Sequence, residues 1–179
     1  VNVASEFGNG TGFELAEPII DLVEYEIKTP FEYSAGASIK VLILTLSGEA
    51  KLIDYTQMQF TEGLGTQYRI ERNKEISDLF RTAVTDNAGA ELKIPNLPVW
   101  GRIGAIYIQS PYAEDSADFD KKYLTAGIGL LLGNVFKIDV AYAYGWWENF
   151  SDNYGSNVSR TLHDVNVQNV VLSISTSLN

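Results

Sequence analysis

The chain has 179 residues, with 13 basic and 23 acidic side chains and a formal charge of −10 at pH 7. This acidic balance argues against a nucleic-acid partner, because phosphate binding needs clustered Lys and Arg. The absence of cysteine excludes disulfides, thiolate metal sites and cysteine nucleophiles. The sequence contains no run of about 18 apolar residues, so no transmembrane helix is predicted. The hydropathy does not exclude a membrane β-barrel, because the strands of such a barrel are polar at every second position.

Seven segments alternate apolar and polar side chains with a period of two, which predicts strands with two different faces. In chain order these segments are residues 22–40, 45–60, 81–94, 99–108, 122–132, 136–150 and 164–178. The stretch FKIDVAYAYGWWENF (136–150) is the clearest case. Phe136, Ile138 and Val140 share one parity there, and Lys137 and Asp139 share the other.

The connections between these segments alternate in length. Short ones are expected at 41–44, 95–98 and 133–134, and long ones at 61–80, 110–121 and 148–163. A meander with tight turns at one end and long loops at the other is typical of outer-membrane barrels. Within the first long connection, the stretch NKEISDLF predicts a helical turn with Asn73 as its N-cap.

The charged parity indicates which face of such a barrel is inside. A Lys or Arg facing lipid near the bilayer midplane costs about 2 to 4 kcal/mol, so a membrane barrel must turn these residues into a polar lumen. The charges expected there are Glu49, Lys51, Glu91, Lys93, Arg102, Lys137 and Asp139.

A soluble barrel of the lipocalin type is the alternative, with the apolar parity in a core and the charges outside. It would expose nearly uncharged Thr-Gly and Ser-rich faces of segments 122–132 and 164–178, which is unusual for a soluble surface. Its first two strands would also exceed the common length in globular proteins. Aromatic residues near strand ends, such as Trp146 and Trp147, suit a membrane interface instead. The pattern therefore favours a transmembrane antiparallel up-and-down β-barrel.

Five stretches, in order along the chain, resemble the FadL outer-membrane transport family. They are IKTPFEYSAGASIKV (27–41), GEAKLIDYTQMQF (48–60), AGAELKIPNLP (88–98), QSPYAEDSADFDKKYLTAGIGLLL (109–132) and YGWWENFSDNYGSNVSRT (144–161). Each stretch alone is a weak motif, whereas the ordered set covers about residues 20–178 and is more specific. That family carries long-chain fatty acids or aromatic hydrocarbons.

The resemblance implies an all-β, fourteen-stranded barrel in a bacterial outer membrane, with an N-terminal plug. This chain then supplies about seven strands of the C-terminal half: residues 1–20 form an extracellular loop segment and 21–179 the strands. The chain starts at Val1 with no initiator methionine or signal peptide, which fits a mature form or a fragment. The implied partners are membrane lipid and a hydrophobic small molecule, and the implied function is passive transport.

Residues that suggest other chemistry have simpler explanations. His163 is the only histidine, and a hydrolase would need a serine and an orienting group to converge on it. Ser159 and Asp164 are merely close to it in sequence, so we expect no catalytic residue and no enzyme. The acidic loop of Glu114, Asp115, Asp118 and Asp120 lacks the glycine and final glutamate of a calcium loop, and a solvated loop without metal or cofactor is expected.

Six apolar residues fall on the polar parity of their strands. In a conduit for apolar ligands they line the path, and in a plugged barrel they contact the plug; the sequence leaves both open. These residues are Ile53, Trp100, Ile106, Ile108, Leu131 and Trp147. Two other functions also stay open: a structural or secretion-associated outer-membrane barrel that binds partner proteins, and a soluble ligand-binding β-barrel.

Overall fold

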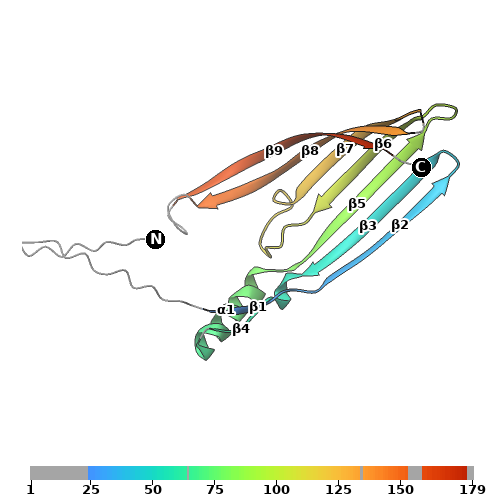
Figure 1. Ribbon diagram of the computed structural model, residues 1–179. Helices are drawn as coiled ribbons and strands as arrows, with labels where there is room; N and C mark the ends of the chain where they lie inside the picture. Colours follow the sequence, from blue (N-terminus) through green and yellow to red (C-terminus); the bar gives the residue numbers. More distant parts are fainter. Residues whose placement is uncertain (1–23, 64, 134, 153–158, 177–179) are drawn as a thin grey trace, which may run out of the picture.

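The computed structural model describes residues 24–63, 65–133, 135–152 and 159–176. These residues form a long curled sheet with a small helical excursion at one end (Figure 1). The strands are β1 (Glu26–Lys28), β2 (Glu32–Val41), β3 (Leu44–Asp54), β4 (Gln59–Glu62), β5 (Thr82–Lys93), β6 (Val99–Ile108), β7 (Lys121–Leu132), β8 (Phe136–Asp152) and β9 (Arg160–Thr176). The helices are a 3-10 turn, η1 (Tyr55–Gln57), and α1 (Thr66–Leu79).

The main sheet has seven strands in the order β2-β3-β5-β6-β7-β8-β9, and every neighbouring pair is antiparallel. The all-β class and the antiparallel sheet of seven strands are thus confirmed. The sheet is open, because β2 and β9 do not pair with each other. We call the end with the connections β2–β3, β5–β6 and β7–β8 the turn end, and the opposite end, near α1, the loop end.

The first two predicted strands are shorter than their sequence pattern. Segment 22–40 is interrupted around Pro30, whose ring removes a backbone donor, and its two parts enter different sheets: β1 pairs with β4, and β2 with β3. Segment 45–60 ends at Asp54, whose carboxylate accepts hydrogen bonds from the Thr56 amide at 3.3 Å and hydroxyl at 2.6 Å. These bonds start η1 and turn the chain out of the sheet.

The third long connection was expected at 148–163, and this prediction is wrong. β8 continues to Asp152 and β9 begins at Arg160, with cross-strand partners throughout. Both strands therefore have 17 residues, and they extend farther at the loop end than their neighbours do. Residues 153–158 and the predicted loop segment 1–20 lie outside the described residues.

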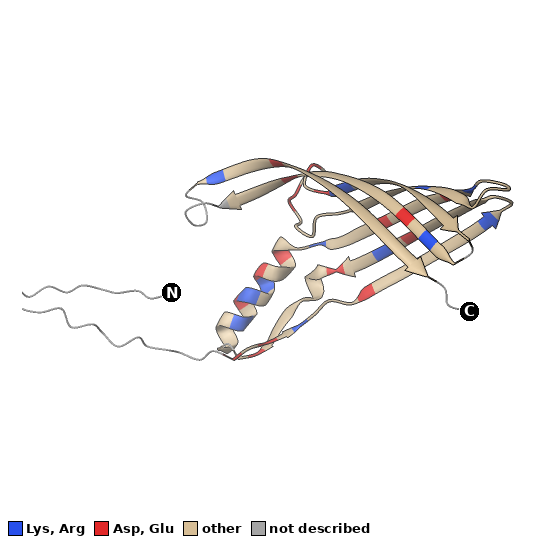
Figure 2. Cartoon of the chain, turned by 45° about the horizontal axis from the view of Figure 1, so that its top comes forward, with Lys and Arg blue, Asp and Glu red and all other residues tan. Residues whose placement is uncertain are grey.

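The predicted N-cap of the helix is also wrong. α1 begins after Gly65 and has Asn73 in its interior. The Asn73 amide makes two hydrogen bonds to the backbone of Phe60: its oxygen accepts from the Phe60 N–H at 2.7 Å and its nitrogen donates to the Phe60 carbonyl at 3.1 Å. Asn73 thus occupies the free edge of β4 and holds the helix against it. Charges of both signs follow the helix along its length (Figure 2).

The connection between β6 and β7 is anchored by Asp120, which is only 2% exposed. Its carboxylate accepts hydrogen bonds from the Ser110 amide at 2.8 Å and from the Tyr107 hydroxyl, and the Arg81 guanidinium lies at 3.8 Å. The expectation of a wholly solvated acidic loop is therefore wrong for Asp120. Because a buried carboxylate needs such partners, it fixes both ends of the loop to the sheet.

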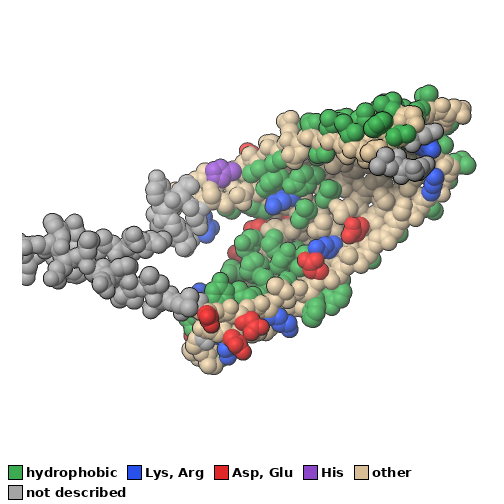
Figure 3. Space-filling view, viewed as in Figure 1, with side chains coloured by type: hydrophobic (Ala, Val, Ile, Leu, Met, Phe, Trp, Pro, Cys, Tyr) green, Lys and Arg blue, Asp and Glu red, His purple; other side chains and the backbone are tan. Residues whose placement is uncertain are grey.

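Strand pairing keeps the two parities separate across all seven strands. Arg102 lies opposite Glu91 and Gly127, whereas Ile103 lies opposite Ala90 and Ala126. The sheet curls so that the charged parity lines the hollow, or concave, face, and the other parity forms the convex face (Figure 3).

The convex face of the single-layered sheet is uncovered. Among the described residues, the only apolar side chain that counts as buried is Ala83. Large apolar side chains of the convex face are each 40–74% exposed: Tyr33, Ile39, Leu46, Leu92, Ile103, Leu124, Ile128, Phe136, Val140, Tyr142, Val170, Leu172 and Ile174. The described sheet thus has one apolar outer surface and no internal core.

Candidate functional site on the concave face

All seven charges that the sequence predicts to face a lumen lie on the concave face. The strand pairing fixes this, because Glu49 lies opposite Asn87 and Glu91 opposite Arg102, and each position two residues along a strand returns to the same face. The face has three parts between the turn end and the loop end: a charged cluster, a groove of small residues, and an apolar zone.

The turn-end cluster is a chain of ion pairs formed by Glu91, Arg102, Asp139 and Lys137. The Arg102 Nε lies 2.6 Å from the Glu91 carboxylate, and its Nη1 lies 2.8 Å from Asp139. The Lys137 ammonium is 3.4 Å from the other Asp139 oxygen. Two positive and two negative charges therefore neutralise one another, and the cluster holds no free cation for an anionic ligand.

The cluster takes side chains from β5, β6 and β8, and it can cross β7 because glycines on the concave face of β7 leave room for them. Arg102 on β6 reaches Asp139 on β8 over Gly127 and Gly129. The Trp100 ring lies over Gly129, where an added Cβ would be 2.1 Å from the indole Nε1 and 2.6 Å from an Asp139 oxygen. Arg102 and Lys137 both contact the Trp100 ring, at 5.4 and 5.0 Å from its centroid. Only glycine at position 129 leaves room for this arrangement.

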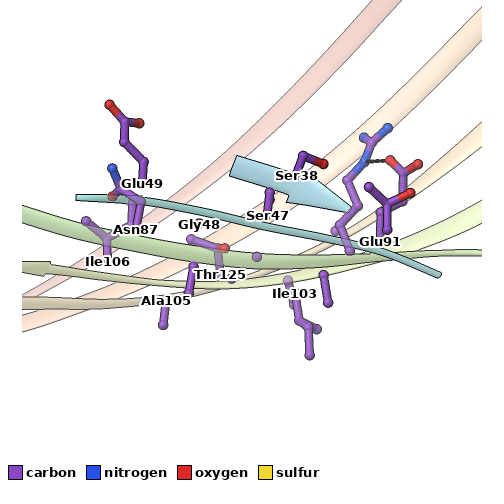
Figure 4. A pocket seen from close by; sticks show the side chains of 18 of the residues that line it. Ser38, Ser47, Gly48, Glu49, Asn87, Glu91, Ile103, Ala105, Ile106 and Thr125 are labelled. Atoms are coloured by element: carbon purple, nitrogen blue, oxygen red, sulfur yellow. Dashed lines mark hydrogen bonds and ion pairs between the residues drawn. The ribbon is translucent and has the colours of Figure 1, made fainter. Parts of the chain in front are cut away.

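The middle of the concave face is a groove of about 1040 Å³. Its lining includes Gly36, Ser47, Gly89, Gly104, Thr125 and Gly127, all small residues of the concave parity. Figure 4 displays the division between the two faces of the sheet: Ser47, Glu49 and Asn87 point to one side, and Ile103 and Ala105 to the other. The groove is open rather than enclosed, and the charged side chains of Glu49, Glu91, Arg102 and Asp139 also line it.

The loop-end apolar zone consists of Ile106, Ile108, Tyr123, Trp147, Val165 and Val167. These residues are neighbours across four strands, since Ile106 pairs with Tyr123 and Trp147 with Val165. The Tyr123 and Trp147 rings are in contact, with centroids 5.9 Å apart. Tyr123 lies over Gly145, where an added Cβ would be 2.4 Å from the ring. Hydrophobic side chains gather in this part of the hollow, toward α1 (Figure 3).

The six predicted ligand-path residues separate into two groups. Trp100 and Leu131 lie at the turn end, where Trp100 is part of the charged cluster and Leu131 lies opposite Lys137. Ile106, Ile108 and Trp147 belong to the loop-end apolar zone. Ile53 lies beside Ala83 at the loop end, two strands away from Ile108. The six residues therefore do not form one continuous path.

Sequence reasoning missed four residues of the loop end: Lys121, Tyr123, Val165 and Val167. Their parity was available as a signal, since they continue the polar parity of β7 and β9. What could not be known from one strand alone is which residues of the next strand lie beside them. The Lys121 ammonium lies over the Trp147 ring at 5.4 Å from its centroid, and Lys121 makes no ion pair with any residue that the structure describes.

His163 contacts a different serine from those considered in the sequence. Its Nε2 lies 2.6 Å from the hydroxyl of Ser151, across the β8–β9 pair and in an exposed position. Asn149 lies directly opposite His163.

The described ranges contain no group of three or more His, Cys, Asp and Glu side chains placed to hold a metal ion. In the same part of the chain, no helix has the length and apolar character needed to cross a membrane.

Comparisons of the chain with protein-family models, with curated proteins and with solved structures find no match. The structure itself defines a structural class: an antiparallel meander sheet that is apolar on its convex face and charged at one end of its concave face. The relation to FadL-like transporters stays a prediction from the five sequence stretches.

Proposed function

We propose that this chain is part of a transmembrane β-barrel of a bacterial outer membrane, and that the barrel carries hydrophobic small molecules by passive diffusion. The observation that supports this best is the convex face: large apolar side chains cover it on seven strands, while the charged side chains lie on the opposite, concave face, where Arg102 pairs with Glu91 and Asp139. This is the arrangement that lipid outside and water inside require.

Water is a poor solvent for such a convex face. Soluble monomers rarely expose a contiguous apolar patch of more than a few hundred Å², and this patch runs from Tyr33 on β2 to Ile174 on β9. In a soluble ligand-binding barrel, this apolar face would have to be buried in the protein's own core. A bilayer covers it directly, and the hydrogen-bonded ladders satisfy the backbone within the sheet.

The height of the apolar surface fits a bilayer. On β8 it extends from Phe136 to Trp146, ten steps of about 3.3 Å each, or about 33 Å along the strand. At the usual strand tilt of about 40°, this covers about 25 Å, the height of the apolar band of outer-membrane barrels.

The loop-end border of this surface has the character of a membrane interface. A row of paired residues crosses the convex face there, from Asp86 through Tyr107, Lys122 and Trp146 to Asn166. Next to this row, the Tyr144 hydroxyl donates to the Asn166 side chain at 2.6 Å, and the Tyr144 and Trp146 rings stack at 5.7 Å. Aromatic rings with a polar end favour such an interface.

The two free edges support a larger barrel. β2 and β9 present unpaired backbone groups, which lipid cannot satisfy, and both strands run from the loop end to the turn end. Antiparallel closure therefore needs an odd number of further strands between them. The seven additional strands of a fourteen-stranded FadL-like barrel meet this condition, whereas two copies of the sheet would join through parallel pairs.

Transport is tested with the full-length protein in lipid vesicles. Vesicles loaded with serum albumin receive a fluorescent fatty acid or a polycyclic aromatic hydrocarbon outside, and the rate at which the probe reaches albumin is measured. The proposal expects faster transfer with protein than in protein-free vesicles, and no gain for a hydrophilic dye of similar mass. Equal rates with and without inserted protein would contradict transport and favour a barrel that serves to bind protein partners.

A further inference from the structure

The turn end of the sheet has an apolar rim, formed by the exposed apolar side chains of its three turns. We propose that this rim lies within the lipid leaflet at the turn end, with Leu42 and Leu97 among the lipid chains and the Lys40 and Lys93 ammonium groups at the level of the lipid phosphates. This inference rests on the proposed membrane location and goes beyond it, because it assigns a lipid-binding surface to the turns as well as to the strands.

The three turns carry exposed apolar side chains and no charged residue. Leu42 is 89% exposed, and Leu97 and Val135 are 54% and 41% exposed. The β2–β3, β5–β6 and β7–β8 hairpins lie side by side at this end of the sheet (Figure 1). The loop of residues 110–120 at the other end has four carboxylates. The sequences of the turns are VLIL (41–44), IPNLP (94–98) and GNV (133–135).

Leu42 has a backbone conformation that is unfavourable for a leucine in water. Its φ is +56°, in the left-handed region where the Cβ atom of an L-residue is crowded. The positive-φ positions of the other two turns are Asn96, at +63°, and Gly133, at +58°, which are residue types that adopt this region readily. Leu42 is both strained and almost fully exposed. Burial of its side chain among lipid chains offsets the strain.

The apolar rim continues the apolar convex face without a polar border. At the loop end this face is bounded by the polar and aromatic row from Asp86 to Asn166. From Trp146 in that row to Phe136, the apolar surface of β8 covers about 25 Å at the usual strand tilt, which places the other edge of the apolar layer at the turn. The convex positions nearest the turns on β2 to β8 are Val41, Leu44, Leu92, Val99, Leu132 and Phe136.

The turns are hydrogen-bonded to the neighbouring hairpins, as a poorly hydrated leaflet requires. The Lys93 N–H donates to the Ile43 carbonyl at 2.8 Å, and the Leu131 N–H donates to the Pro98 carbonyl at 2.8 Å. Pro95 and Pro98 have no N–H that needs a partner. These groups therefore stay satisfied when the turns enter the leaflet.

Two lysines beside the turns favour phosphate groups at this level. Lys40 and Lys93 are the last concave-face residues of β2 and β5, and both are exposed. Neither forms an ion pair with a described residue, whereas the nearby carboxylates of Glu91 and Asp139 are paired with Arg102. A lysine stem can lie on apolar surface while its ammonium reaches the headgroups, and anionic headgroups attract it. The rim therefore matches a leaflet that contains anionic phospholipid.

Fluorescence quenching in lipid vesicles tests the position of the rim in the full-length protein. The chain contains no cysteine, so Leu42→Cys and Glu114→Cys each add a single labelling site to it, one at each end of the sheet. We expect phosphatidylcholine with a nitroxide near its headgroup to quench a label at position 42 at least twofold, and aqueous iodide to quench it little. The label at position 114 should show the reverse. Tyr142→Cys, on the convex face, is the positive control for lipid contact.

Leu42→Asn gives a second test whose sign depends on the surroundings. Asparagine relieves the left-handed strain and removes the apolar side chain. In vesicle-inserted protein the urea midpoint should fall, because contact with lipid chains is lost. A side chain that faces water would give a higher midpoint instead, because only the relief of strain would remain.

The lysines are tested by changing the lipid that carries the nitroxide. Quenching at position 42 should be about twofold stronger with labelled phosphatidylglycerol than with labelled phosphatidylcholine. Lys40→Gln combined with Lys93→Gln should remove this difference. Lys122→Gln, at the loop end, should leave it unchanged.

Three outcomes would overturn the inference or part of it. A label at position 42 that iodide reaches and lipid nitroxides do not, or a higher urea midpoint for Leu42→Asn, would place the rim in water and leave it free for a protein partner. With position 142 still quenched by lipid, the membrane proposal would stand. Absence of lipid quenching at both positions would contradict both proposals. Equal quenching by the two lipids would remove the lysines from the site.

Discussion

The turn end and the loop end of the concave face share one packing arrangement, an aromatic ring over a glycine, but one surface is charged and the other apolar. At the turn end, the Trp100 ring lies over Gly129 and supports a chain of ion pairs. At the loop end, the Tyr123 ring lies over Gly145 and contacts Trp147. In both places an aromatic ring packs over a glycine on the neighbouring strand and fills the space that a side chain would otherwise occupy. The charged residues added around the ring decide whether the surface is ionic or apolar.

This difference follows the surroundings of the opposite face. Behind the turn-end cluster lie exposed apolar residues such as Val140 and Ile103, and behind the loop-end zone lie Asp86, Lys122 and Glu148. A single-layered sheet cannot bury either face on the other, so each face has to match its own solvent. If the proposed membrane location holds, the exchange of polarity along strands β6 to β9 marks the height at which the outer solvent changes from lipid to water.

The largest expected effect separates the two ends of the convex face. Ile103→Lys puts an ammonium into the middle of the apolar surface and should lower the unfolding free energy in lipid vesicles by about 2 to 4 kcal/mol. Trp146→Lys lies at the loop-end border and should cost markedly less through its charge, because the penalty falls to about 0 to 1 kcal/mol near an interface.

The matched control is Thr125→Lys, which adds the same charge on the concave face of the next strand. Urea titration of vesicle-inserted protein measures all three variants. If Ile103→Lys and Thr125→Lys lowered the unfolding free energy by similar amounts, the proposal that the convex face contacts lipid and the concave face contacts water would be contradicted.

A second change loosens the loop end alone. Asp120→Ala removes the acceptor of the Ser110 amide and the Tyr107 hydroxyl and leaves Arg81 without its buried partner. A loss of about 3 kcal/mol is expected, with faster hydrogen exchange in residues 109–120 and no change in β5–β6 at the turn end. The control is Asp118→Ala: among the described residues, the Asp118 carboxylate accepts one hydrogen bond, from the Ser116 hydroxyl at 3.4 Å. In this variant, residues 109–120 should exchange at the rate of the unsubstituted protein.

A third change breaks the turn end. Gly129→Ala forces a methyl group into the Trp100 ring and the Asp139 carboxylate, and overpacking of this kind costs about 2 kcal/mol. Gly101→Ala, on the adjoining strand, has no atom within 4 Å of the added Cβ and should be near neutral. Thermal unfolding of the two variants in the same detergent provides the comparison, and equal stabilities would mean that Trp100 does not lie over Gly129.

The smallest effect concerns the ion pairs themselves. A double-mutant cycle of Arg102→Gln and Asp139→Asn should give a coupling of about 1 kcal/mol, because the two side chains are 39% and 20% exposed and water screens them partly. Raising the salt concentration should reduce the coupling further. A coupling of zero at low salt would indicate that the two groups do not pair.

The sequence predicted the strands and their faces because the alternation of apolar and polar side chains can be seen within one strand, whichever strands lie beside it. The parity of Asp139 and Arg102 could be read in this way. Their ion pair could not, because it depends on the register of three strands and on the glycines of β7. Likewise, nothing local indicated that Asn73 would bind the β4 edge, or that Asp120 would be buried. The break at Pro30 was visible in the sequence and was overlooked because alternation continues on both sides of it.

The central claim is that the convex face contacts lipid and the concave face contacts water. Ala141 and Tyr142 are neighbours on β8 that face opposite ways, and both are exposed. Each is replaced by cysteine in the full-length protein, labelled with an environment-sensitive fluorophore and inserted into vesicles with a lipid-bound quencher. The account predicts a blue-shifted, lipid-quenched label at position 142 and a wet label at 141 that a soluble quencher reaches. A label at 142 that lipid quenchers leave untouched, with 141 buried from water, would contradict it.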